Sequence, residues 1–273
     1  MDICGKNASV LVLNGGLSNI KDLCIAAHPD DAEIMAYGQI AACYKNGGFA
    51  VAVLTNGGGS PRAGAYADIT DEEMKEIRFK EQINAALIGN YSALFWLGYS
   101  SADVKTGAQS VKNDIATIFL ETTPERVFIH NLADKHDTHV ASALRSIDAL
   151  RKVKDEFRPS KIYMMEVWRG LDWVGDGEKT LFDTSLYPEL AEKILNVYES
   201  QISGGKEYTK ATVGRRFANA TFLESHSVDN LKSASLGIDI TDFVYSEDDP
   251  CDFISGYVDS FRNDVTSRIS KYK

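Results

Sequence analysis

A short apolar run that ends in a His-Pro-Asp-Asp turn constrains the fold of this chain more than any other feature. Residues 23–27 (LCIAA) lead directly into residues 28–31 (HPDD), and residues 32–44 then read as a helix closed by the Asn-Gly-Gly of 46–48. Five small or apolar residues bounded by a proline are typical of a buried, parallel strand. The turn therefore lies at the carboxyl end of a strand, where open α/β sheets bind their ligands.

Strand-like and helix-like segments alternate over the first 170 residues. Further strands are predicted at 9–13 (an edge strand), 49–55, 93–97, 126–130 and 161–166, and further helices at 70–90, 109–120 and 140–152. This alternation is typical of an α/β fold of the Rossmann-like, doubly wound kind, with a mostly parallel sheet and helices on both faces.

The character of the chain changes after the last of these strands. We expect residues 1–170 to form the catalytic core and residues 171–273 to form a C-terminal α+β extension. Within the extension, helices are predicted at 187–202 and 252–271, and a strand at 238–245. We expect the extension to complete the substrate pocket and to pack with the core as one domain.

Composition and charge exclude several classes of protein. The 273 residues carry a formal charge of −10, which argues against binding to nucleic acid. No stretch approaches the roughly 20 apolar residues of a membrane span, and the N-terminus lacks the basic and apolar regions of an export signal. We therefore expect a cytoplasmic protein, with a homo-oligomer as an open option. Reduced thiols are expected for the four widely spaced cysteines, Cys4, Cys24, Cys43 and Cys251.

The turn at residues 28–31 places one imidazole and two carboxylates together. Such a cluster buries charge at a cost unless a cation is present, which favours a metal site. The alternative is that Asp30 or Asp31 only caps the following helix, although a cap requires one Asp and does not require His28. Taken alone, the turn leaves both interpretations open.

A second polar segment follows the strand at 126–130. Residues 130–139 (HNLADKHDTH) contain three of the five histidines and reach the same edge of the sheet as the first turn. His28, Asp31 and one of these histidines would supply two imidazoles and one carboxylate, with positions left open for water and substrate. That set is typical of catalytic zinc, and it can also hold ferrous iron. The residues therefore indicate a hydrolytic metalloenzyme without identifying the bond that is cut.

Two motifs resemble those of a known family. Residues 27–31 (AHPDD) reproduce the signature of the PIG-L / LmbE-like N-acetylglucosaminyl deacetylases, and residues 134–139 (DKHDTH) resemble its second motif, DxHPDH. The pair Arg78 and Glu81 resembles the family's RxxE helix, although these two residues could equally be a solvated pair on a helix surface. The resemblance covers roughly residues 20–170. It implies a metal-dependent N-deacetylase that releases acetate from an N-acetylated amino sugar or glycoside.

The resemblance also implies a role for each matching residue. It makes His28, Asp31 and His139 the ligands of one divalent metal, Zn²⁺ in the first place, with Fe²⁺ as the alternative. Asp30 becomes the general base, and His136 the group that stabilises the oxyanion and protonates the leaving amine. Arg78 is implied to contact the substrate.

The second motif departs from the family pattern at one place. Thr138 stands where the family often has an Asp, and Asp137 stands in the place of the proline. Asp134 or Asp137 is then left to orient His136, and Asp134 is also a candidate for substrate binding.

Rival functions use the same residues differently. A non-haem Fe(II) oxygenase would share the ligand set, but such enzymes usually carry it on a β-barrel. A non-catalytic sugar- or nucleotide-binding module would have no use for a free Asp30 beside the ligand Asp31. The glycine-rich loop at 56–62 lacks both common phosphate-binding spacings, so it is expected to be a wall of the site.

Overall fold

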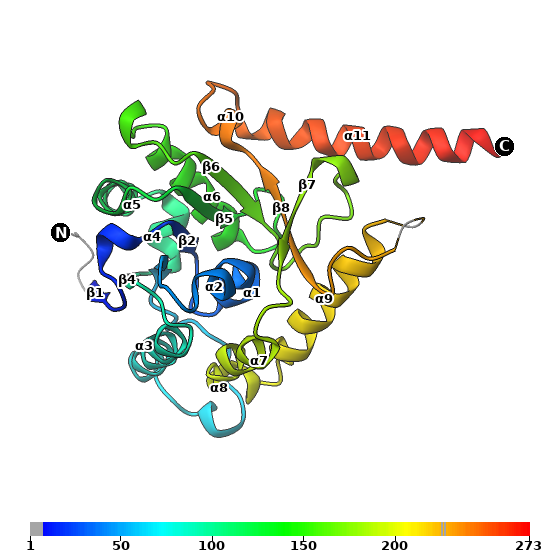
Figure 1. The fold of residues 1–273 in the computed structure, drawn as a ribbon. Helices are drawn as coiled ribbons and strands as arrows, with labels where there is room; N and C mark the ends of the chain where they lie inside the picture. Colours follow the sequence, from blue (N-terminus) through cyan, green and yellow to red (C-terminus); the bar gives the residue numbers. More distant parts are fainter. Residues whose placement is uncertain (1–7, 225, 227) are drawn as a thin grey trace.

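A computed structural model describes residues 8–224, 226 and 228–273. Its centre is an eight-stranded sheet with the strand order β1-β4-β3-β2-β5-β6-β8-β7 (Figure 1). The strands are β1 (Ser9–Val12), β2 (Asp22–Ala26), β3 (Phe49–Thr55), β4 (Ala93–Tyr99), β5 (Arg126–His130), β6 (Lys161–Met165), β7 (Lys179–Asp183) and β8 (Ala234–Asp239). Strands β4, β3, β2, β5 and β6 pair in parallel, and β1, β8 and β7 add antiparallel pairs at the two edges.

Helices lie on both faces of the sheet. They are α1 (Asp31–Met35), α2 (Tyr37–Cys43), α3 (Asp71–Ile88), α4 (Ser101–Thr106), α5 (Gln109–Thr122), α6 (Asp137–Leu150), α7 (Pro188–Asn196), α8 (Glu199–Ile202), α9 (Tyr208–Phe222), α10 (Thr241–Val244) and α11 (Pro250–Lys271). One apolar cluster joins the sheet to α5 and α6, and a second joins it to α1, α2, α3 and α7. The mixed α/β fold with a mostly parallel sheet and two covered faces is as predicted.

Strand β2 explains the position of the site. Its five residues are all buried, with Leu23 and Ile25 in one apolar cluster and Cys24 and Ala26 in the other. The chain runs from β2 outward through β3 to β4 and then returns to place β5 on the other side of β2. The carboxyl ends of β2 and β5 therefore flank the point where the strand order reverses, which is where such sheets bind ligands.

The predicted helix at 32–44 is wrong in one respect, because it is interrupted at Ala36 (φ −115°, ψ 23°). Nη2 of Arg216 on α9 donates to the carbonyl oxygens of Glu33 (2.6 Å) and Ile34 (3.2 Å). In an unbroken helix these carbonyls would accept from the residues four positions later. A residue more than 180 positions away thus satisfies the interrupted turn.

Other differences concern the C-terminal third. The predicted helix at 187–202 is two helices, α7 and α8, and the predicted strand at 238–245 is β8, which ends at Asp239 before α10 begins. Strand β7 and helix α9 were not predicted. Both β7 and β8 join the central sheet, because β8 pairs with β6 and with β7.

The cysteines of the described residues are free thiols at positions 24, 43 and 251, and Cys4 lies outside the described residues. Among the described residues, every helix is too short or too polar to cross a membrane.

Candidate metal centre and active site

The turn after β2 is held in an unusual backbone conformation. Asp30 has φ +90° and ψ −24°, a left-handed conformation that is uncommon for residues other than glycine. The backbone N–H of His28 donates to Oδ2 of Asp31 at 2.7 Å, and the N–H of Ile34 donates to the carbonyl of Asp30 at 3.1 Å. Such strain persists only where surrounding contacts enforce it, and it is frequent in active sites.

His28, Asp31 and His139 meet at one point. Nδ1 of His28 lies 3.2 Å from Oδ2 of Asp31 and 3.1 Å from Nε2 of His139, and that Nε2 lies 3.3 Å from Oδ1 of Asp31. Ligand atoms bonded to tetrahedral zinc at about 2.0–2.1 Å are about 3.3 Å apart. The three groups therefore fit a single divalent ion with at least one position open.

His130 lies beside this triad and is fully buried. Its Nε2 is 3.2 Å from Oδ2 of Asp31 and accepts a hydrogen bond from the backbone N–H of Ala27 at 2.9 Å. Burial and the neighbouring His139 lower the pKa of His130 to about 4, so its ring is neutral. Because the Nε2 lone pair already accepts from Ala27, His130 is a poorer candidate for binding the ion than His28 or His139.

His139 carries a proton when no metal competes for it. Burial opposes the charged form, but the carboxylates of Asp31 and Asp134 outweigh it and raise the pKa of His139 to about 10. The pKa of Asp31, which burial alone would raise, is held well below its usual range by His139 and His130. A positive charge is thus required between these carboxylates, and a divalent ion can supply it in place of the proton.

Asp30 is not part of the triad but contacts Arg78. Nη2 of Arg78 donates to Oδ2 of Asp30 at 2.8 Å and to the carbonyl of Pro29 at 2.6 Å, and Nη1 donates to Oε2 of Glu81 at 2.8 Å. Arg78 is 1% exposed, so the solvated helix pair considered from the sequence is wrong. Burial raises the pKa of Asp30 to about 7, with Arg78 opposing the shift and Asp31 adding to it.

A buried polar network supports this turn from behind, and no sequence pattern pointed to it. Oε1 of Gln82 accepts from the backbone N–H of Asp30 (3.4 Å) and from the hydroxyl of Tyr198 (3.0 Å). Nε2 of Gln82 donates to Oε1 of Glu33 at 3.0 Å, and the Tyr91 hydroxyl donates to the same oxygen at 2.6 Å.

His136 and Asp134 have different roles at the site. His136 begins α6, and its Nδ1 accepts from the N–H of Thr138 at 3.3 Å, which leaves Nε2 to carry the proton of the neutral ring. Burial, His28 and His139 lower the pKa of His136. Asp134 accepts from the backbone N–H of His136 (2.9 Å), and its Oδ2 lies 3.4 Å from Nδ1 of His139. Asp134 thus orients His139 rather than the imidazole of His136, and it lies behind the site instead of facing a substrate.

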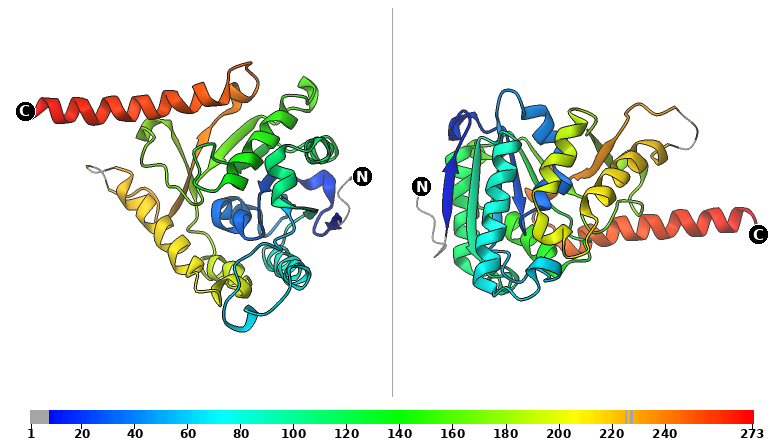
Figure 2. Two further views of the ribbon diagram at one scale, coloured as in Figure 1. Left: turned by 180° about the vertical axis from the view of Figure 1, so that it is seen from behind. Right: turned by 90° about the horizontal axis from the view of Figure 1, so that it is seen from below.

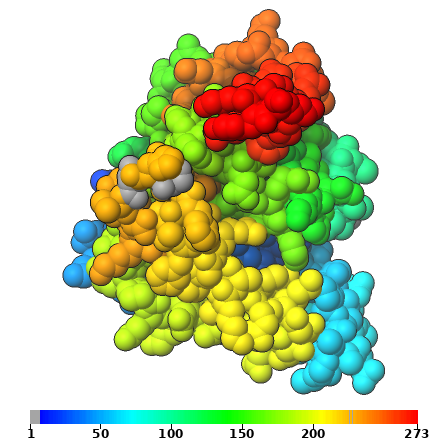
Figure 3. Space-filling model, turned by 90° about the vertical axis from the view of Figure 1, so that its right-hand side faces the viewer, coloured from blue at the N-terminus to red at the C-terminus, as the bar shows by residue number. Residues whose placement is uncertain are grey.

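A cavity of about 590 Å³ opens above these residues. Its floor is lined by His28, Asp30, Asp31, Arg78 and His136. Residues 57–61 of the glycine-rich loop also line the cavity, so the loop is a wall of the site, as predicted. Gly57 (φ +70°) approaches so closely that a Cβ there would meet Cβ of Arg78 at 2.9 Å. Figure 3 shows the surface hollowed between the yellow and green segments, with blue early residues at the floor.

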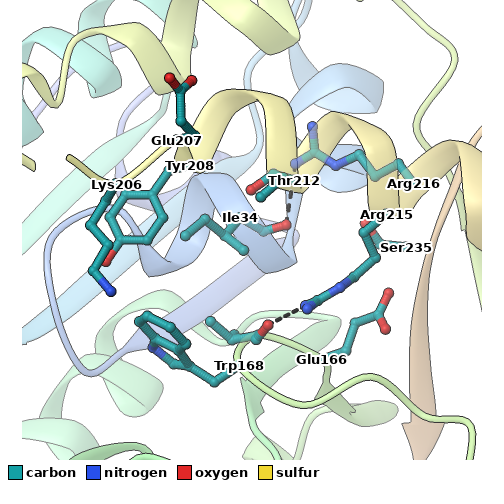
Figure 4. Close-up of a pocket in the computed structure, with 12 residues that line it drawn as sticks. Ile34, Glu166, Trp168, Lys206, Glu207, Tyr208, Thr212, Arg215, Arg216 and Ser235 are labelled. Carbon is teal, nitrogen blue, oxygen red and sulfur yellow. Dashed lines mark hydrogen bonds between the residues drawn. The ribbon is translucent and has the colours of Figure 1, made fainter. Parts of the chain in front are cut away.

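A second cavity of about 240 Å³ adjoins the first, and both are lined by Trp168, Lys206 and Tyr208. Figure 4 shows Arg215 and Arg216 reaching into this region from α9, with Arg215 donating to the carbonyl of Val167.

Comparisons with known proteins agree with this fold. N,N'-diacetylchitobiose deacetylase from Pyrococcus horikoshii superposes with a TM-score of 0.66 at 18% identity, over 85% of this chain and 88% of that chain. The conserved protein TT1542 from Thermus thermophilus gives 0.61 at 20% identity, over 80% and 94%. GalB, the 4-carboxy-2-hydroxymuconate hydratase from Pseudomonas putida, gives 0.59 at 18% identity, over 81% and 96%. No curated protein matches the chain.

The family comparison covers the part of the chain that carries both motifs. Residues 23–150 match the model of the PIG-L family, GlcNAc-PI de-N-acetylase. This range contains the turn after β2, helix α3 with Arg78, and the segment from β5 into α6. Residues 23–150 of this chain therefore form a domain of the PIG-L family.

Proposed function

We propose that this protein is a metal-dependent N-deacetylase of the zinc type, which removes the acetyl group from an N-acetylglucosamine-like amino sugar or glycoconjugate and releases acetate. The observation that carries the proposal is the pairing of the His28–Asp31–His139 triad with Asp30, which faces the same cavity but is free of the triad. The PIG-L domain and the N-acetylated substrate named for the Pyrococcus deacetylase support this choice of bond.

His28, Asp31 and His139 would hold one divalent ion, Zn²⁺ or alternatively Fe²⁺. When bound, the ion would supply Lewis-acid polarisation of the acyl carbonyl and of the attacking water. The residues of the chain then handle the protons. Asp30, whose pKa is about 7, takes the proton of the water as it attacks the carbonyl carbon. His136 directs its Nε2 proton toward the developing oxyanion and supports proton delivery to the amine as the C–N bond breaks.

The C-terminal extension, residues 171–273, would complete the substrate pocket. Gln201, Lys206 and Tyr208 line the same cavity as His28, and Nζ of Lys206 lies 5.3 Å from the centre of the Trp168 ring. A sugar ring could stack on Trp168 while its hydroxyl groups meet Lys206 and Tyr208. The adjoining cavity would receive whatever is attached to the amino sugar. We place the enzyme in the cytoplasm, which its free thiols support.

The fold alone does not select the reaction, because it is shared with a hydratase. The test is a panel of N-acetylated glucosides and disaccharides, scored for acetate release with Zn²⁺ or Fe²⁺ added to metal-free protein. Acetate release that depends on the metal and not on oxygen is expected. Oxygen consumption would instead indicate the Fe(II) oxygenase, and tight sugar binding without turnover would indicate the binding module.

A further inference from the structure

Three cationic side chains line the smaller of the two cavities, the one of about 240 Å³. Lys206 lies just before α9, and Arg215 and Arg216 lie on this helix, which packs against α7 and β8 (yellow in Figure 2). None of the three forms an ion pair with a carboxylate in the described part of the chain. Because the whole protein carries a formal charge of −10, a group of unpaired cations in one cavity calls for an explanation.

Arg216 is a buried charge without a counter-ion. The residue is 4% exposed, and its Nε and Nη1 are shielded from solvent and have no hydrogen-bond partner among the described residues. Burial lowers the pKa of Arg216 to about 10, so the guanidinium stays charged at neutral pH. The Tyr37 ring, whose centre is 4.7 Å from Cζ, offsets only part of the cost of burying this charge. An anion in the cavity would offset more of it.

Two carboxylates also line this cavity, but they do not neutralise it. Oε2 of Glu207 lies 2.9 Å from Nζ of Lys210, and Figure 4 shows the Glu207 side chain directed away from the other labelled residues. Oε1 of Glu166 accepts from the backbone N–H of Leu236 at 3.2 Å, and burial raises the pKa of Glu166, which favours its neutral form. Even a charged Glu166 would leave two of the three cations unbalanced.

We propose that this cavity binds an anionic oxygen group, a carboxylate or a phosphate, on the aglycone of the amino-sugar substrate. This substrate class rests on the proposed deacetylase function and narrows it to acidic glycosides. Trp168 and Tyr208 line both cavities, so a sugar held above the catalytic residues would extend its substituent directly into the smaller one.

Arg215 and Lys206 are the residues that would contact the anion. Arg215 donates from Nη1 to the carbonyl of Val167, which holds the guanidinium in place and leaves its remaining N–H groups for a ligand. Lys206 lies at the junction of the two cavities, against the Trp168 ring. Hydrogen bonds from these two groups to an anion are charge-assisted, and such bonds are about twice as strong as neutral ones. Arg216, whose free N–H groups are enclosed, would contribute its charge rather than a direct contact.

Calorimetric binding of three matched glycosides tests the anion site. The probes are N-acetyl-β-D-glucosaminides with 2-hydroxyethyl, carboxymethyl and 2-phosphoethyl aglycones, and the protein is the full chain carrying Asp30→Asn and loaded with Zn²⁺. At least one acidic glycoside should bind about 10 to 100-fold more tightly than the hydroxyethyl glycoside, the scale of one or two charge-assisted hydrogen bonds. The tighter of the two acidic probes identifies the group as carboxylate or phosphate. Equal affinity for all three would overturn the proposal.

Substitutions in the same background test which residues hold the anion. Arg215→Gln and Lys206→Met should each reduce the ratio of acidic to neutral affinity by about tenfold, and Arg215→Lys, which keeps the charge, should restore part of it. The matched control is Lys210→Met, because Lys210 is an exposed cation on the same helix whose side chain pairs with Glu207 outside this cavity. It should keep the full ratio. An unchanged ratio in both Arg215→Gln and Lys206→Met would overturn the proposal.

Acetate release by the wild type from the same three glycosides tests the reaction separately, because the affinity ratio requires no turnover. A protein that prefers an acidic glycoside but releases acetate from none of them would refute the deacetylase and leave the anion site in place. Release of acetate from all three with the same kcat/KM would support the deacetylase and overturn the anion site.

Discussion

Arg78 donates from Nη2 to Oδ2 of Asp30 at 2.8 Å while the same nitrogen donates to the carbonyl of Pro29 at 2.6 Å. One buried guanidinium therefore holds the backbone of the turn at Pro29 and also acts on the pKa of the Asp30 carboxyl group. Burial drives the pKa of Asp30 upward, and Arg78 limits the rise, so that the group titrates at about 7. Arg78 therefore positions Asp30, the general base that we propose.

Arg78→Lys is expected to shift the pH profile rather than substrate affinity. A lysine cannot reproduce the forked contact with Asp30, Pro29 and Glu81, so the pKa of Asp30 should rise further. The acidic limb of kcat/KM should move upward by about one pH unit, the scale of a weakened charge-assisted hydrogen bond. KM at the pH optimum should stay within about twofold, as it should for the exposed control Lys80→Gln. A raised KM with an unmoved acidic limb would instead mean that Arg78 contacts the substrate.

Asp30 and Asp31 should fail differently when each is changed to asparagine. Asn tolerates the left-handed conformation of residue 30, so Asp30→Asn should fold and retain its metal. Its kcat should fall by about 10² to 10⁴-fold, the usual loss for a general base, and added metal should not restore it. Asp31→Asn should lose metal affinity and recover part of its activity in excess metal. The measurement is metal stoichiometry and kcat across a metal titration, and identical behaviour of the two variants would refute the assigned roles.

The strands and the positions of both motifs could be predicted from sequence because they depend on local information. Five apolar residues before His28 and the strand at 126–130, which leads into the 130–139 segment, are sufficient to place two strand ends at one sheet edge. The interruption at Ala36 could not be predicted, since its carbonyls are satisfied by Arg216, far along the chain. The burial of Arg78 is equally non-local. Its partner Glu81 is covered by α8, where the backbone N–H of Ser200 donates to Oε1 of Glu81 at 2.7 Å.

The question of what orients His136 also required the structure. The sequence left Asp134 and Asp137 as candidates, because Thr138 replaces the usual Asp. The structure uses the backbone N–H of Thr138 instead, which donates to Nδ1 of His136. A backbone donor leaves no trace in the residue pattern, so no motif could have revealed it.

Glu33→Gln is expected to gain stability relative to the wild type as pH rises. Glu33 is fully buried, and its Oε2 has no hydrogen-bond partner among the described residues. Burial raises the pKa of Glu33, so its favourable contribution is complete below the unfolded value near 4.5 and is lost as pH rises through the folded value. The variant cannot ionise there. Its free energy of unfolding relative to wild type should therefore increase by up to about 1.4 kcal/mol per pH unit above pH 4.5.

Urea denaturation of both proteins from pH 4.5 to pH 8 measures this difference. Glu76→Gln is the matched control, because Glu76 is exposed on α3 and should show a nearly flat difference over the same range. A difference that stays constant or falls for Glu33→Gln would mean that Glu33 is ionised at no cost in the folded protein.

Metal binding should release a proton from His139. Metal affinity and proton release together should distinguish the histidines that bind the ion from those that do not. In the metal-free protein the pKa of His139 is raised to about 10, so at pH 8 its proton must leave before Nε2 can bind an ion. Calorimetric titration with Zn²⁺ at pH 8, in buffers of different ionisation enthalpy, should show one ion per chain and about one proton released from His139.

His28→Ala and His139→Ala should both lose most of the metal, and the residual binding of His139→Ala should release about one proton fewer. His130→Asn should retain the ion with affinity reduced about 10 to 100-fold, as for a residue that lies against a ligand without binding the ion. The exposed His226→Ala should match the wild type in stoichiometry, affinity and proton release. If His130→Asn loses the ion and His28→Ala keeps it, the ion is held by Asp31, His130 and His139 instead, and the cavity-facing site built on His28 is wrong.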